Sequence, residues 1–227
     1  MISVVLFDLD GTLVDCIVPM EHILVRVLEN LGVRALGTKK KYVIENLRKI
    51  LLQGNSPFDG LRLLWRVGRY LGMPPHKRVV MMLFAYRSLK EVFLNSPLFP
   101  EAKQVLDELR KRGIVMGIVT TRSAKEAEYV LKRHSIDEYF KIVVSRDLVN
   151  RGKPHPDPII FALRKMGFSP AQAVMVGDMP TDIEAGKAAG AKTIALAIGI
   201  FNDALRESGA DVIAASLQDI PCLIEAL

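Results

Sequence analysis

Two aspartates follow an apolar run at the start of the chain, in "MISVVLFDLDGTLVD". The run from Ile2 to Phe7 has the length and composition of a strand buried on both faces of a parallel sheet. Asp8 and Asp10 come next, one residue apart. A charged side chain inside an apolar core is costly unless it is paired, so we expect both carboxylates to lie past the end of the strand. Open parallel sheets bind their ligands at that edge.

Other polar groups occur where later apolar segments end. Thr120 ends "GIVT", Asp178 follows "VMVG" with Asp182 four residues on, and Lys153 precedes a helix in "RGKPHPDP". Two carboxylates about 4 Å apart repel by about 4 kcal/mol at an effective dielectric constant of about 20, so converging carboxylates require a positive charge. Oxygen donors without His or Cys beside them suit Mg²⁺, and Lys153 supplies a second positive charge.

The segments that position these residues alternate between strand and helix beyond Pro97, which indicates a doubly wound α/β domain with a parallel sheet and right-handed crossovers. Helix-start signals agree with this pattern, because Ser123 with Glu126 and Thr181 with Glu184 both fit a capping box. The expected strands are residues 2–7, 114–120, 141–145, 173–178, 192–198 and 211–214; the expected helices are residues 101–113, 123–134, 156–167 and 181–190 and a last one from 217.

A different pattern occupies residues 18–95, where apolar residues recur at three- and four-residue spacing in several helical stretches. Breaks are expected at Gly32, at 54–57 and at 72–75. We therefore expect a Rossmann-like core formed by residues 1–14 and 96–227, with a helical cap domain inserted at residues 15–95.

The insertion also carries the excess positive charge of the chain. Residues 15–90 contain 14 basic and 5 acidic residues, a net charge of +9, while the whole chain has a net charge of +6. The inserted segment is therefore more positively charged than the rest of the chain, which favours an anionic partner for the inserted domain.

Composition narrows the class of protein further. The chain has 227 residues, half of them hydrophobic, and no apolar run approaches the ~18 residues that a membrane span requires. Its N-terminal residues lack the features of a signal peptide, and its two cysteines show no disulfide or zinc spacing. We expect a soluble cytoplasmic protein without a membrane partner, and the sequence leaves monomer and homodimer open.

Four segments together resemble one enzyme superfamily. The segments "DLDGTLVD", "VTTR", "KPHPDP" and "GDMPTD" occur in the order that is typical of haloacid dehalogenase phosphatases. The chain is most similar to subfamily I members with a helical cap, the phosphoglycolate phosphatase and β-phosphoglucomutase group. Dehalogenating members lack the second aspartate, so the resemblance implies phosphate chemistry rather than dehalogenation.

The resemblance implies roles for the first two aspartates. Asp8 would be the nucleophile that forms an aspartyl-phosphate and a ligand of Mg²⁺. Asp10 would protonate the leaving alkoxide and then activate water, and its backbone carbonyl would bind the metal.

Five further residues receive roles in the same way. Asp178 would bind Mg²⁺, and Asp182 would support the metal shell. Thr120 and Lys153 would hold the phosphoryl oxygens, with Thr121 beside them, although Asn is frequent at that position in the family. The substrate would be a small phosphorylated metabolite, with phosphoglycolate as one candidate.

Other functions remain open at this point. The catalytic residues do not separate a phosphatase from a phosphomutase, which returns the phosphoryl group to a sugar. A non-enzymatic binding or regulatory module is a third possibility, because the calculated pI is about 9.3. No aromatic interleaving or zinc-finger spacing supports a nucleic-acid partner, so none is expected.

Some residues near the motifs have two interpretations. Arg122 could face the crevice or the surface, with equal weight, and His155 between two prolines fits a loop residue better than a general base. The basic run at 39–41 fits a solvated helix start, although it could also face an anionic substrate.

Overall fold

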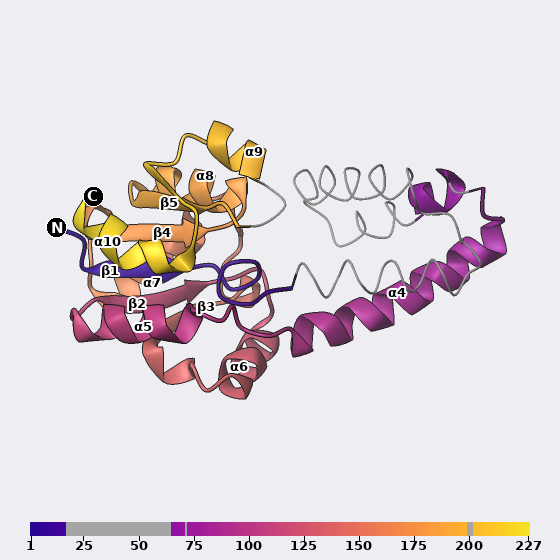
Figure 1. Cartoon of the computed structure of the whole chain (residues 1–227), viewed down its shortest axis with the longest axis horizontal. Helices are drawn as coiled ribbons and strands as arrows, with labels where there is room; N and C mark the ends of the chain where they lie inside the picture. The colour runs from indigo at the N-terminus through magenta and orange to yellow at the C-terminus, as the bar shows by residue number, and fades with distance from the viewer. Residues whose placement is uncertain (17–64, 71, 199–201) are drawn as a thin grey trace. The chain divides into compact units, whose positions relative to one another are not determined.

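The computed structural model describes residues 1–16, 65–70, 72–198 and 202–227 (Figure 1). The chain divides into two compact units, one formed by Met1–Asp15 with Ser96–Leu227 and the other by Cys16–Asn95. The helices expected before residue 65 and the basic run at 39–41 lie outside the described residues.

The described strands of the first unit form one parallel sheet with the order β3-β2-β1-β4-β5-β6. The doubly wound α/β fold is thereby confirmed. β1 lies in the middle and pairs with both β2 and β4, so the direction of winding reverses beside it, which is the place where such sheets bind ligands. The strands are β1 (Val4–Phe7), β2 (Val115–Val119), β3 (Phe140–Val144), β4 (Ala173–Gly177), β5 (Lys192–Leu196) and β6 (Val212–Ala214).

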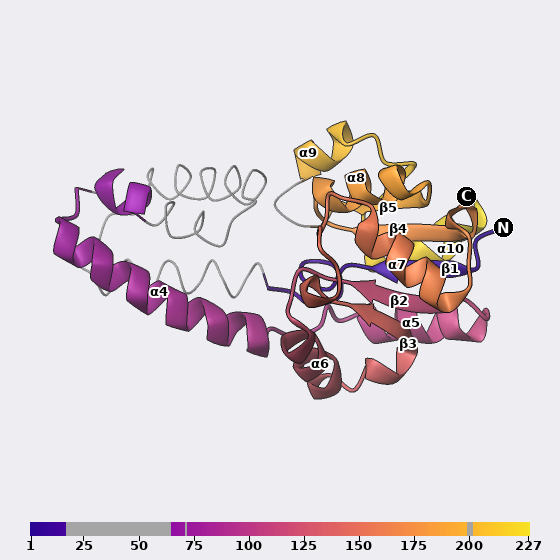
Figure 2. The same cartoon turned by 180° about the vertical axis from the view of Figure 1, so that it is seen from behind.

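Helices cover both faces of the sheet, as the two opposite views show (Figures 1 and 2). One face packs against α5 (Ala102–Lys111), α6 (Ala124–Arg133) and α10 (Ile220–Glu225), and the other against α7 (Asp157–Met166) and α8 (Pro180–Ala189). The central strand contributes to both cores, because successive side chains of a strand point to opposite faces.

The residues of β1 illustrate this division. Val5 and Phe7 belong to the core under α5, α6 and α10, whereas Val4 and Leu6 belong to the core under α7 and α8. All four side chains are fully buried, and full burial of one such side chain is worth about 1.5–3 kcal/mol. The apolar run at the start of the sequence therefore anchors the strand from which Asp8 emerges.

Of the two capping boxes predicted from the sequence, the structure confirms one and contradicts the other. At α6 the Ser123 hydroxyl accepts a hydrogen bond from the Glu126 N–H, and the Glu126 carboxylate accepts one from the Ser123 N–H at 3.1 Å. The capping box predicted for Thr181 is wrong, because α8 begins at Pro180 and Thr181 lies in its first turn. Proline fits a first helical position, where no N–H is needed.

Shorter elements complete the first unit. Helix α9 (Asn202–Glu207) was not predicted, and 3₁₀ turns connect several of the longer elements. These turns are η1 (Asp137–Tyr139), η2 (Arg146–Leu148), η3 (Pro170–Gln172) and η4 (Leu217–Asp219).

The described part of the second unit is helical. Residues 65–70 form a helix, and α4 spans Pro75–Asn95. The chain between them contains Gly72 with a φ of 74°, in agreement with the break expected at 72–75. Among the helices in the described ranges, none has both the length and the apolar character needed to cross a membrane.

Candidate active site

Asp8, the first residue after β1, lies against the neighbouring strand of the sheet, β4. The Asp8 N–H donates to the carbonyl of Val176 in β4 at 2.9 Å. Gly11 follows with a φ of 82°, and a Cβ at this position would collide with the carboxylate of Asp178. Only glycine therefore permits both the backbone conformation and the close approach of this loop to the end of β4.

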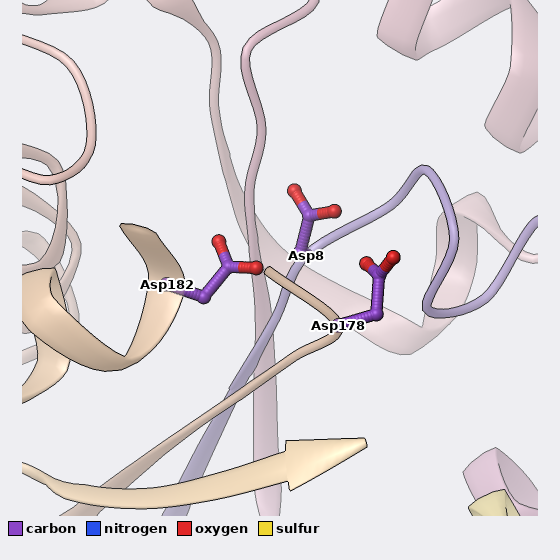
Figure 3. A group of neighbouring side chains, drawn as sticks. All are labelled: Asp8, Asp178 and Asp182. Carbon is purple, nitrogen blue, oxygen red and sulfur yellow. The ribbon is translucent and has the colours of Figure 1, made fainter. Parts of the chain in front are cut away.

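Three carboxylates from two parts of the chain meet at this edge. Asp8 follows β1, Asp178 follows β4, and Asp182 lies in the first turn of α8. One oxygen of each lies within 4.8 Å of the others, and all three residues are buried. Figure 3 shows the three carboxyl groups pointing to the same side. The expected convergence of carboxylates at the carboxyl end of the sheet is thus present.

A buried lysine lies among these carboxylates. Lys153 Nζ is 2.6 Å from Asp8 Oδ1 and 2.6 Å from Asp182 Oδ1, and its side chain is only 4% exposed. It also donates to the carbonyl of Val119 at the end of β2, at 3.0 Å. Burial lowers the pKa of the ammonium group, but the two carboxylates raise it by more, and the net shift is upward. Lys153 is therefore a fixed positive charge.

One ammonium group does not compensate three buried carboxylates. Burial raises the pKa of Asp8 to about 6, although Lys153 opposes the shift. Burial and the charges of Asp8 and Asp182 raise the pKa of Asp178 well above its usual range. The hydrogen bond from the Thr12 hydroxyl to Asp178 Oδ1, at 3.0 Å, lowers it only in part. A cluster of hard oxygen donors with excess negative charge fits a bound Mg²⁺ ion.

The two threonines after β2 differ in their surroundings. Thr120 is buried, its N–H donates to the carbonyl of Val144 at 2.9 Å, and its hydroxyl accepts from the Arg122 N–H at 3.2 Å. Thr121 is exposed. A phosphate-binding role for either residue remains a prediction.

His155 belongs to the loop before α7. Its Nδ1 accepts a hydrogen bond from the Asp157 N–H at 3.3 Å, which helps to fix the first turn of this helix. This contact agrees with the interpretation of His155 as a loop residue.

Asp10 is paired with an arginine whose position the sequence did not decide. Arg122 Nε donates to Asp10 Oδ2 at 2.7 Å, and a terminal guanidinium nitrogen donates to Asp10 Oδ1 at 2.5 Å. Arg122 is buried, so the crevice interpretation was correct. The sequence signal for this position is that Arg122 follows Thr120, at the end of β2, by two residues. Because β2 lies beside β1 in the sheet, a residue just after β2 comes close to the segment after β1. Burial raises the pKa of Asp10, and Arg122 opposes this rise.

Comparison with known proteins identifies the family. The family model described as haloacid dehalogenase-like hydrolase matches residues 5–196. The chain belongs to the haloacid dehalogenase-like hydrolase family. The resemblance inferred from the four motifs is thereby confirmed.

Individual members of this family resemble the chain over nearly its whole length. A phosphoglycolate phosphatase of Escherichia coli (strain K12) is 30% identical, with 95% of this chain and 90% of the relative covered. The structure of a predicted phosphoglycolate phosphatase from Haemophilus somnus has a TM-score of 0.76 at 25% identity, covering 98% of this chain and 97% of the other. A haloacid dehalogenase-like protein from Agrobacterium tumefaciens shares the fold, with a TM-score of 0.77 at 22% identity over 100% and 99% of the two chains.

The family and its phosphatase members define the class of reaction. The chain is an enzyme of the haloacid dehalogenase family, a phosphatase that acts on phosphoric monoesters. The acidic cluster and Lys153 meet at Asp8, directly after the central strand β1.

Proposed function

We propose that this protein is a Mg²⁺-dependent phosphatase that hydrolyses phosphoglycolate through an aspartyl-phosphate on Asp8. The observation that carries the proposal is the buried cluster in which Lys153 contacts Asp8 beside Asp178. The name of the substrate comes from the relatives, which are phosphoglycolate phosphatases with 30% identity to this chain.

Asp8 is suited to nucleophilic attack by its position and its surroundings. Its backbone is fixed by the hydrogen bond to β4, and its carboxylate is held by Lys153 at 2.6 Å. In the first step an oxygen of Asp8 forms a bond to phosphorus, and the bond from phosphorus to the substrate oxygen breaks. Phosphoryl transfer depends mainly on positioning and charge stabilisation, and a rigid carboxylate next to a fixed ammonium group supplies both.

Asp10 transfers protons in both steps of the proposed reaction. Its carboxylic acid gives a proton to the departing oxygen, and the resulting carboxylate then takes a proton from the water that attacks the aspartyl-phosphate. Inorganic phosphate leaves, and both Asp8 and the proton on Asp10 are restored. Asp10 lies on the segment after β1 and is not a member of the three-carboxylate cluster, so we assign its side chain to proton transfer rather than to metal ligation.

The carboxylates of Asp8 and Asp178 would hold Mg²⁺ together with the backbone carbonyl of Asp10. Asp182 would support this shell, because its carboxylate also contacts Lys153 and the Met179 N–H. A bound Mg²⁺ ion neutralises negative charge on the phosphoryl group and the carboxylates. Lys153 and Thr120 would contact the phosphoryl oxygens.

Charge also favours a small anionic substrate. Residues 15–90, which make up most of the segment assigned to the cap, carry a net charge of +9. A positive domain raises the local concentration of an anion such as phosphoglycolate. We therefore assign the excess charge to the capture of a phosphorylated metabolite rather than to nucleic-acid binding.

The experiment is a phosphate-release assay with phosphoglycolate, sugar phosphates, nucleotides and pyrophosphate in the presence of Mg²⁺. We expect the highest kcat/KM for phosphoglycolate, and we expect Asp8→Asn to abolish release of phosphate. Asp137→Asn, which removes an exposed carboxylate from η1, is the matched control and should keep full activity.

The two parts of the proposal can fail separately. Release of phosphate by the Asp8→Asn variant would overturn the mechanism. A higher kcat/KM for another phosphate ester would replace the substrate but leave the mechanism intact, and transfer of the phosphoryl group to a sugar would identify a mutase.

A further inference from the structure

The pair formed by Arg122 and Asp10 joins two loops that are far apart in the sequence. Both oxygens of the Asp10 carboxylate accept hydrogen bonds from one guanidinium group, at 2.7 and 2.5 Å. The arginine side chain is 7% exposed and that of Asp10 is 20% exposed. A two-point contact of this kind fixes both the position and the plane of a carboxylate.

The loop that carries Arg122 is itself held in place. The Arg122 N–H donates to the Thr120 hydroxyl, and the Arg122 carbonyl accepts from the Arg146 N–H at 3.0 Å. One residue beyond the cap of α6, the Ala124 N–H donates to Asp147 Oδ2 at 2.8 Å. The guanidinium group therefore projects from a backbone that is anchored to the segment after β3.

We propose that Arg122 is a positioning residue for catalysis, which holds Asp10 at the site of proton transfer and stabilises its carboxylate form. The inference rests on the proposed function, because it assigns Arg122 a part in the step that Asp10 performs. Arg122 itself does not contact the phosphoryl group in this role.

The carboxylate form of Asp10 arises in the first step of the reaction. The bond between phosphorus and the leaving oxygen breaks, and its electron pair takes the proton of the Asp10 carboxylic acid. The negative charge then lies on Asp10, where two guanidinium N–H groups stabilise it. In the second step this carboxylate removes a proton from water, and Asp10 returns to the acid.

A role in proton donation depends on the leaving group. A phenolate with a nitro group departs with little need of a proton, whereas an unsubstituted phenolate is more basic and needs one. Loss of Arg122 should therefore slow the hydrolysis of phenyl phosphate more than that of p-nitrophenyl phosphate. The ratio kcat/KM covers only the steps up to departure of the phenol, so it isolates the first step.

The experiment measures kcat/KM for both aryl phosphates in the wild type and in Arg122→Met, Arg122→Lys and Asp10→Asn. We expect Arg122→Met to reduce kcat/KM for phenyl phosphate by about 10- to 100-fold. The reduction for p-nitrophenyl phosphate should be smaller by about tenfold. Arg122→Lys, which keeps the charge but not the two-point contact, should recover part of the loss for phenyl phosphate.

Arg146→Met is the matched control, because its exposed side chain lies on the loop that anchors Arg122. Arg146→Met should leave kcat/KM unchanged for both aryl phosphates. Mg²⁺ affinity, measured from the dependence of rate on metal concentration, should also stay unchanged in Arg122→Lys, since the carboxylate that accepts the two guanidinium hydrogen bonds belongs to Asp10 and not to the three-residue cluster.

An equal loss for both substrates in Arg122→Met and in Arg122→Lys would overturn the proposal, because a purely structural role affects both alike. Failure of the proposed function has a different signature. In that case the wild type releases no phosphate from either substrate, or Asp10→Asn keeps the wild-type preference between them.

Discussion

Replacement of Asp8 by asparagine should stabilise the metal-free protein at neutral pH while it abolishes hydrolysis. The Asp8 carboxyl is buried, and its pKa is raised from 3.8 to about 6 in the folded protein. The folded state thus binds a proton more tightly than the unfolded state. The contribution of Asp8 to the free energy of unfolding is therefore complete below about pH 4. It falls as the pH rises and is lost above about pH 6.

The magnitude follows from the size of this pKa difference. At about 1.4 kcal/mol for each pKa unit, ionised Asp8 costs the folded state about 3 kcal/mol at pH 7.5. Asparagine does not ionise, so Asp8→Asn removes this cost. It retains a side-chain oxygen that can accept the hydrogen bond from Lys153 Nζ. In a chain of this size, about 1 kcal/mol corresponds to a change in Tm of about 2–4 °C.

The assay is thermal or urea unfolding of the wild type and Asp8→Asn in EDTA, at pH 7.5 and at pH 4. We expect the variant to be more stable by about 3 kcal/mol at pH 7.5 and equal to the wild type near pH 4. Asp137→Asn removes an exposed carboxylate and should show no difference at either pH. If the wild type is the more stable protein at pH 7.5 in EDTA, the ion pair with Lys153 outweighs the burial of Asp8, and the reasoning is refuted.

Three further predictions concern the metal, the loop after β1 and the core. Mg²⁺ should raise the Tm of the wild type but not of Asp178→Asn, and an equal rise in both would remove Asp178 from the metal site. Gly11→Ala should lose about 1–2 kcal/mol from backbone strain and most of the activity, because its Cβ collides with the Asp178 carboxylate; unfolding and kcat measurements check both effects. Leu106→Ala in α5 should cost about 2–5 kcal/mol of unfolding free energy without a change in KM, whereas an altered KM would contradict a purely structural role.

The sequence predicted the elements of the core unit because local patterns decide them. The four residues before Asp8, Val4–Phe7, are all apolar, and a run of this kind is typical of a strand that is covered on both faces. The same reasoning placed Asp8 and Asp178 at one edge of the sheet, since parallel strands bring their carboxyl ends together. Strands β1 and β4 are neighbours in the structure, as this convergence requires.

Helix boundaries were predicted less well, because a local signal can compete with a stronger one nearby. Thr181 and Glu184 fit a capping box, yet Pro180 already begins α8, and Asp182 accepts the hydrogen bond from the Met179 N–H. Helix α9 escaped prediction because it is only six residues long and has little apolar periodicity.

The charged contacts of the site depended on tertiary structure alone. The sequence showed that Asp8, Lys153 and Asp182 were present, but not that one ammonium group contacts both carboxylates at 2.6 Å. It left Arg122 undecided between surface and crevice, whereas the order of strands brings this residue to Asp10 across 112 positions of the chain. Residue types and spacing determine which groups lie at the edge of the sheet. Strand order and side-chain packing determine which of them are paired, because those contacts join segments that are distant in sequence.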